Sequence, residues 1–452
     1  MSVGRIPVAE TARWRSSPIA CSTKRVFPLV TVSFVFRGGT TQDPPGKEGL
    51  AALTARLLER GTRRRTRARI ADEVETMGGS FSAHAERESI RLDGFVLSRS
   101  LDPMLDVFAD MILEPAFSEE ELELAKDEML AEIALAREDD RDLGDHYMRH
   151  AVFGDSAYGR FPGGTDRSIP RIARDDVVGR WREGLVAGNL IAGAAGDIDL
   201  DGLAKVLDRH LGRLPGREPM PPPEATPRAL DGIEVLLVDK PERTQSQIFL
   251  AHPTLSPHDP DFVPFYMANH AFGGMFTGRL MQEVRVKRGW SYAAHSRVEV
   301  QRRSSLTAVW TFPGNDDTIS CVRLLLDLIR DFGAKGVSGG ELDAAKGHLL
   351  NTLSFDVETP EQRVQRRIYE ILLGLPDDWL QRFAEGAEAV DLARANRAAA
   401  RAIQPDRMAL VIVCTADRFT SQLREIPSVR TVDVVPFDAE EPSSWKRVFE
   451  RA

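Results

Sequence analysis

The sequence predicts an α+β protein made of two homologous α/β-sandwich halves, each a mainly antiparallel sheet with helices packed on one face. Strand and helix signals do not alternate regularly, because many strands follow each other directly or are separated by two helices. A proline-rich segment lies near the middle of the chain. Sequence patterns on its two sides match in the same order, which indicates an internal repeat.

The strand predictions rest on alternation and on short apolar runs. Val30, Val32, Phe34 and Phe36 recur at every second position, as expected for a half-buried strand. The other expected strands lie at 90–97, 190–195, 234–238, 248–251, 306–312 and 408–414. Apolar residues at helical spacing predict helices at 49–60, 103–113, 119–137, 200–211, 265–272, 279–287, 318–332, 341–353 and 361–373.

The segment 214–230, LPGREPMPPPEATPRAL, predicts an extended linker. Its clustered prolines cannot donate to a helix or to a sheet ladder. We therefore divide the chain into an N-terminal extension at 1–26, a first domain at 27–213, this linker, and a second domain at 231–452. Each half has roughly 220 residues, which is an ordinary domain size.

Two matched patterns indicate that the halves are related. Glu121 begins ELELAKDEML and Glu341 begins ELDAAKGHLL, and each lies three residues after a serine, Ser118 or Ser338. Each Ser-x-x-Glu pair predicts a capping box at the start of a long helix. A weaker match joins EVETMGGSFSAH with EVRVKRGWSYAAH. Capping boxes also occur in unrelated helices, but two matches in the same order favour duplication.

Composition excludes several classes of protein. The 452 residues are 42% hydrophobic and 28% charged, close to globular averages. The net charge of −9 argues against nucleic-acid or anionic-membrane partners. No apolar run is long enough to span a bilayer. The N-terminus lacks a signal-peptide core and three cysteines form no disulfide framework, so we expect a cytoplasmic protein, with a periplasmic location left open.

Motifs for nucleotide binding or serine hydrolysis are incomplete. The glycine pairs form no GxGxxG sequence after a strand, and no GxSxG sequence is present. His146 and His150 lie four apart on an expected helix, but a zinc site needs a third ligand. Because the surrounding segment DHYMRH is highly charged, we expect both histidines to be solvated surface residues.

A longer series of motifs carries a family resemblance. The first half contains, in order, LVTVSFVFRGG, TTQDPPGKEGLAALTARLLERGT, GGSFSAHAERESIRLDGFV, ILEPAFSEEELELAKDEMLAEI and SAYGRFPGGTDRSI. The second half contains NHAFGGMFTGRLMQEVRVKRGWSYAAHS. From about residue 27 to about residue 437 the chain resembles the pitrilysin/insulinase (inverzincin) family of zinc peptidases, in particular its small dimeric bacterial members.

The resemblance implies a degenerate zinc site. The family's catalytic helix carries His-x-x-Glu-His, two zinc ligands with a general base between them. Aligning GLAALTARLLERGT with that helix places Ala52 at the first His, Ala55 at the base and Arg56 at the second His, while Glu132 matches the third ligand. We therefore expect no zinc, no cofactor and no catalytic residue in this chain. We expect Arg56 to pair with Glu132; the alternative is that both point to solvent.

A second family feature is retained in the C-terminal half. Family members carry an Arg and a Tyr, seven residues apart, that contact substrate opposite the zinc. Arg285 and Tyr292 match them. An Arg fork and a phenol can bind the substrate carbonyl and stabilise the oxyanion. The alternative is a surface Arg beside a Tyr that packs in a strand.

Together these features imply a non-catalytic subunit of a heterodimeric zinc metallopeptidase. A homologous catalytic partner with His-x-x-Glu-His would hold the zinc, and this chain would form half of a closed chamber for unfolded peptides. One alternative is a purely structural or scaffolding homologue, as in some respiratory complexes, which the retained Arg285 and Tyr292 disfavour. Another is an active homodimer with an unrelated site, which the lack of any other triad or metal cluster disfavours.

Overall fold

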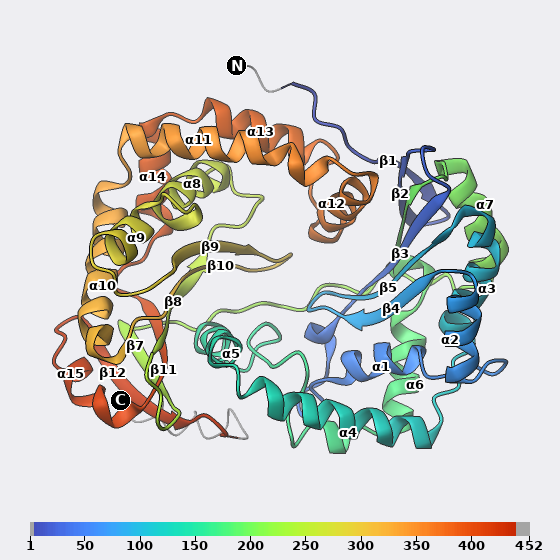
Figure 1. Ribbon diagram of the computed structural model, residues 1–452, viewed down its shortest axis with the longest axis horizontal. Helices are drawn as coiled ribbons and strands as arrows, with labels where there is room; N and C mark the ends of the chain where they lie inside the picture. Colours follow the sequence, from blue (N-terminus) through green and yellow to red (C-terminus); the bar gives the residue numbers. More distant parts are fainter. Residues whose placement is uncertain (1–3, 440–452) are drawn as a thin grey trace.

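The computed structural model describes residues 4–439 and contains two six-stranded sheets on opposite sides of the molecule (Figure 1). The first sheet has the order β1-β2-β6-β3-β5-β4. Its neighbours are antiparallel except β2 and β6. Its strands are β1 Glu10–Trp14, β2 Ser17–Thr23, β3 Leu29–Arg37, β4 Ser80–Ala85, β5 Ser89–Leu97 and β6 Leu190–Gly196.

The second sheet has the order β12-β7-β11-β8-β10-β9. It is antiparallel from β11 to β9, and β7 runs parallel to both of its neighbours. Its strands are β7 Ile233–Asp239, β8 Gln247–Thr254, β9 Ala294–Val300, β10 Ser305–Thr311, β11 Met408–Cys414 and β12 Val429–Pro436. Five strands therefore repeat the order found in the first half, and the predicted α+β fold of two related halves is confirmed.

Helices complete each half. The first half contains α1 Leu50–Leu58, α2 Arg67–Thr76, α3 Leu101–Leu113, α4 Glu119–Ala136, α5 Asp140–Phe153, α6 Arg174–Gly184 and α7 Leu200–Leu211. The second contains α8 Phe262–Asn269, α9 Arg279–Met281, α10 Thr318–Lys335, α11 Gly339–Leu353, α12 Pro360–Leu373, α13 Trp379–Ala389, α14 Leu392–Ala402 and α15 Thr420–Arg424. π-Helical turns follow α8 and α9 at His270–Gly274 and Gln282–Val286. No helix in this described part of the chain is long and apolar enough to cross a membrane.

The two predicted helix starts are present. Ser118 accepts a hydrogen bond from the Glu121 amide at the start of α4, and Ser338 accepts one from the Glu341 amide at the start of α11. Only in α11, among these two, does the glutamate reach back to the Ser amide to complete the capping box, at 2.7 Å. Both helices therefore begin with a serine cap, but the predicted capping box is complete only in α11.

The two halves exchange one helix each. Helix α5 packs on the second sheet against β8 and β11, and α12 packs on the first sheet against β2 and β6 (Figure 1). Apolar side chains of α12, such as Ile368 and Val364, cover Val35 and Ile191 of the first sheet. Each half covers one sheet face with its own helices, as expected, and the other face with a helix from its neighbour. Separating the halves would expose apolar surface on both sheets.

The N-terminal segment corrects one expectation. Residues 1–26 were expected to be an extension outside the first domain, but β1 and β2 belong to the first sheet, where β2 pairs with β6. Strand β1 exposes four of its five side chains and β2 begins with a Ser-Pro pair, so neither shows clear apolar alternation. The segment 214–230, expected to be a linker, contains neither helix nor strand.

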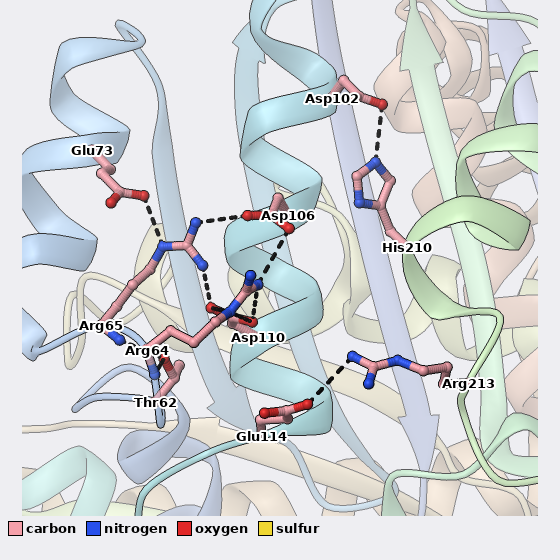
Figure 2. Close-up of polar contacts among 10 residues, drawn as sticks. All are labelled: Thr62, Arg64, Arg65, Glu73, Asp102, Asp106, Asp110, Glu114, His210 and Arg213. Atoms are coloured by element: carbon pink, nitrogen blue, oxygen red, sulfur yellow. Dashed lines mark hydrogen bonds and ion pairs between the residues drawn. The ribbon is translucent and has the colours of Figure 1, made fainter.

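Paired charges hold the loop after α1 against α3 (Figure 2). Arg64 and Arg65 both contact the carboxylate of Asp110, which is only 3% exposed. Arg65 also donates to Asp106 at 2.7 Å and to Glu73 at 2.8 Å. Because a buried carboxylate needs such partners, this cluster fixes the chain that leaves the expected catalytic helix.

Candidate functional site

The helix at the expected zinc position, α1, is well formed and packs against α4 and the edge strand β4. Its start is capped by the buried carboxylate of Asp43, which accepts hydrogen bonds from the amides of Gly49 at 3.0 Å and Ala51 at 2.9 Å. Burial raises the pKa of Asp43 to about 7, although Arg180 and both amides act against this. The local frame of the helix therefore does not depend on a metal.

The residues at the expected ligand positions of α1 offer no metal donor. Ala55 is fully buried in the core of the first half. Ala52 is partly buried and lines a cavity beside the helix. Arg56 presents a permanent cation at the position expected for the second ligand. These residues do not fit a zinc ion, and within residues 4–439 no cluster of three His, Cys, Asp or Glu side chains is placed to hold a metal.

Arg56 and Glu132 form the ion pair that the sequence predicts. Nη2 of Arg56 donates to Oε1 of Glu132 at 2.8 Å and to Oε2 at 2.6 Å. Nη1 donates to Glu128, one turn earlier on α4, at 3.4 Å. The predicted pairing is confirmed. A guanidinium thus lies between α1 and α4, beside the carboxylate that matches the family's third ligand.

This pair belongs to a longer series of ion pairs, the α1–α4 ladder, formed by Arg56 and Arg60 with Glu121, Glu128 and Glu132. Arg60, just after the end of α1, contacts Glu128 and lies 3.2 Å from Glu121. Arg60, Glu121 and Glu128 were not among the site residues expected from the sequence. Their signal was available, because arginines four apart and glutamates at positions 121, 128 and 132 each share a helix face.

A cavity of about 320 Å³ opens beside the ladder. Helix α1 contributes Ala52 and Arg56 to its wall, and α4 contributes Met129 and Ile133. Edge strand β4 adds residues 83–85, and further parts of the wall come from α5, the loop at 161–165 and the segment near Phe437. Mixed apolar and polar walls beside a free strand edge suit an extended peptide.

The two histidines of α5 correct another expectation. They were expected to be solvated, but His150 is only 4% exposed and burial lowers its pKa to about 4. His146 lines the cavity and contacts the Phe161 ring edge-on at 5.2 Å, and burial lowers its pKa too. The charged residues around them do not indicate a solvated surface, because Arg149 forms an ion pair with Glu299 of β9 in the second half.

Arg285 and Tyr292 lie in the second half and are not among the residues that line this cavity. Arg285 is in the π-helical turn Gln282–Val286, with its guanidinium carbon 4.8 Å from the centre of the Phe276 ring. Tyr292 precedes β9 and is 78% exposed. Tyr292 therefore does not pack in a strand, which was the alternative reading, and its side chain is accessible to another molecule, whereas Arg285 is half-buried.

Comparisons with known proteins agree with this description. The family model described as Insulinase (Peptidase family M16) matches residues 19–161, and the model described as Peptidase M16 inactive domain matches residues 171–349. An uncharacterized zinc protease of Mycobacterium tuberculosis is 26% identical over 321 residues, which is 70% of this chain and 73% of that protein. The non-peptidase homolog YmxG of Helicobacter pylori is 24% identical over 381 residues, which is 84% of this chain and 87% of that protein.

Solved structures show the same fold. A crystal structure of a peptidase M16 inactive domain from Pseudomonas fluorescens has a TM-score of 0.82 and 21% identity, and the match covers 95% of this chain and 99% of that one. A chain of complex III2 from Candida albicans has a TM-score of 0.75 and 14% identity, with 91% and 97% covered. The two family models match residues 19–161 and 171–349, which together make up well over half of the chain, and this chain therefore belongs to the insulinase family of peptidases, M16.

Proposed function

We propose that this chain is the non-catalytic subunit of a heterodimeric zinc metallopeptidase. The observation that carries the proposal is the Arg56–Glu132 ion pair, which lies on an otherwise intact helix α1 where the family would hold zinc. Ala52 and Ala55 supply neither a ligand nor a base, so no step of peptide hydrolysis is assigned to this half. The name of the related non-peptidase homolog YmxG supports the same reading.

The partner is a homologous chain with His-x-x-Glu-His, and it supplies the zinc. This chain closes the other side of the chamber and presents Arg285 and Tyr292 to the substrate at the partner's metal. Tyr292 is exposed, and the Arg285 guanidinium lies over an exposed Phe276 ring that limits its motion. A fork of N–H donors and a phenol suit a carbonyl oxygen that gains negative charge during attack.

Unfolded peptide binds this chain as an extended strand. The free edge of β4 offers backbone hydrogen-bonding groups, and Ala83 and Ala85 of that strand line the cavity beside the ladder. Main-chain pairing at a sheet edge accepts many sequences, while a cavity selects side chains at alternate positions. Peptide held there remains uncut, because the adjacent helix carries Arg56 instead of metal ligands.

The test mixes the purified chain with a homologous chain from the same genome that contains His-x-x-Glu-His. We expect no cleavage of an unfolded fluorogenic peptide by this chain alone and zinc-dependent cleavage by the pair. Arg285→Ala or Tyr292→Phe should lower kcat of the pair by about 100- to 1,000-fold, the range for losing one oxyanion donor. The matched control is Arg288→Ala, since Arg288 pairs with Glu283 in the same segment. A complex that forms but cleaves equally well with either variant contradicts the proposal.

A purely structural role is the second candidate. It is favoured by the likeness to a chain of complex III2 from Candida albicans, which shares the fold over nearly its whole length. This reading predicts a stable complex whose activity is indifferent to Arg285 and Tyr292. The same variants therefore separate the two candidates.

A further inference from the structure

A second cavity, away from the α1–α4 ladder, lies where the two halves meet. Its volume is about 800 Å³, within the range of small-molecule sites. The wall combines β1 and the end of β3 with the proline-rich segment at 218–222, the turn between β9 and β10, and the end of α12. We call this the arginine cavity, because Arg13, Arg37, Arg302 and Arg367 line it.

The charges in the arginine cavity are unbalanced. Asp377 and Glu218 are the carboxylates among its lining residues. Arg367 already engages Asp377, and it also lies 3.2 Å from Glu370. One carboxylate, Glu218 on the proline-rich wall, thus faces three further arginines. This excess of positive charge is local, because the whole chain carries a net charge of −9.

Three of these arginines lack an ion-pair partner. Among residues 4–439, no ion pair joins the side chains of Arg13, Arg37 or Arg302 to a carboxylate, although the charge of the nearby Glu88 carboxylate acts on Arg302 at longer range. The nearby Glu88 accepts a hydrogen bond from the Arg302 backbone amide at 3.1 Å. Burial, together with the positive charges of Arg302 and Arg13, lowers the pKa of Arg37 to about 10. Like charges gathered in a half-buried space repel one another and lower the stability of the folded state.

The wall opposite these arginines is well fixed. The amide of Met220 donates to Oδ1 of Asn189, which is fully buried, at 2.6 Å. The adjacent prolines restrict the backbone further. A stiff wall facing unpaired guanidinium groups is preorganised, so a ligand would not have to order it on binding.

We propose that the arginine cavity binds a small oxyanion that carries two or more phosphate or carboxylate groups. Guanidinium groups present planar forks of donors that match the oxygen pairs of phosphates and carboxylates. A multivalent anion would neutralise Arg37 and Arg302 together and remove their mutual repulsion. The ligand would contact the first sheet, the proline-rich segment and α12 at once, and would therefore stabilise the junction between the halves.

The test is thermal unfolding and calorimetric titration of the full chain with pyrophosphate and, separately, with citrate. Sodium chloride at matched ionic strength is the control for screening. We expect the midpoint to rise by several degrees at about 100 times Kd, as for any ligand that binds only the folded state. A rise with pyrophosphate alone indicates a phosphate compound, a rise with citrate alone indicates a polycarboxylate, and a rise with both indicates a general oxyanion site.

Variants provide the decisive comparison. Arg37→Met or Arg302→Met should weaken binding at least about tenfold, because a charge-assisted hydrogen bond is lost. Arg303→Met is the matched control, since Arg303 is exposed, adjacent in sequence and not part of the cavity wall. Without added anion, Arg37→Met should raise the unfolding midpoint, because it removes the repulsion between Arg37 and the neighbouring arginines. If Arg37 instead stabilises the fold, the same substitution should lower the midpoint. No anion-specific shift in the parent chain, or unchanged affinity in both Arg variants, overturns the proposal, and neither readout depends on peptidase activity.

Discussion

The α1–α4 ladder predicts that two neighbouring arginines contribute very differently to stability. The Arg60 side chain is 6% exposed, and its partners Glu128 and Glu121 are 38% and 25% exposed. Arg56 is 26% exposed, and its main partner Glu132 is 59% exposed. Breaking a fully buried pair costs about 3–5 kcal/mol, whereas an exposed pair contributes about 0–1 kcal/mol. Because its partners are partly solvated, we expect Arg60→Met to cost about 2–3 kcal/mol and Arg56→Met less than about 1 kcal/mol.

Urea unfolding followed by circular dichroism at neutral pH measures both losses. The loss in Arg56→Met should shrink further in 1 M salt, which screens exposed charges, while the loss in Arg60→Met should persist. Adding Glu128→Gln to Arg60→Met should restore part of the stability, because the stranded carboxylate is then removed. Equal losses in the two single variants, or a larger loss for Arg56→Met, would refute this account of the ladder.

Two further predictions concern the half-buried carboxylate of Glu341 and the expected metal position on α1. Although burial opposes it, hydrogen bonds from Arg279 and the Ser338 cap lower the pKa of Glu341 from about 4.5 to about 2. A carboxylate whose pKa is lowered by folding stabilises the folded state above pH 4.5. The free energy of unfolding should therefore fall by about 3 kcal/mol as the pH falls from 4.5 towards 2. Glu341→Gln should flatten this part of the pH–stability curve. In the triple variant Ala52→His, Ala55→Glu and Arg56→His, zinc should raise the unfolding midpoint, because α1 keeps the family's frame. A chelator should reverse this rise, and the parent chain should not show it. A folded triple variant whose midpoint does not rise with zinc would contradict the alignment.

Parts of the fold that are buried on both faces could be predicted closely from the sequence. The run at 408–414 matches β11 in both bounds, because every side chain of this strand is buried and apolar. The start of α4 could be predicted because the Ser118 cap is a local interaction. Strand β1 could not, since its exposed side chains leave no alternation and its place depends on pairing with β2. Local signals therefore predicted the elements whose stability is local or wholly apolar.

The candidate site shows the same division. The Arg56–Glu132 pair could be predicted, because the frame of α1 fixes one partner and a family position fixes the other. The spacing of Arg60 from Arg56 indicates a shared helix face, but the partners of Arg60 are set by the packing of α1 against α4. The exchange of α5 onto the second sheet was also hidden. The charged residues of α5 suggest a solvated face, but in the structure Arg149 forms an ion pair with Glu299 of the other half.

The ladder also explains how α1 can retain its position without a metal. The acidic side chains Glu121, Glu128 and Glu132 lie along the face of α4 that contacts α1, so bringing the helices together requires a cation between them. Arg56 of α1 and Arg60, just after the end of α1, supply that positive charge. Because a guanidinium repels a second cation, the arginine and the metal exclude each other at this position. The same guanidinium that would repel a metal at this position therefore also ties α1 to α4 through Glu128 and Glu132.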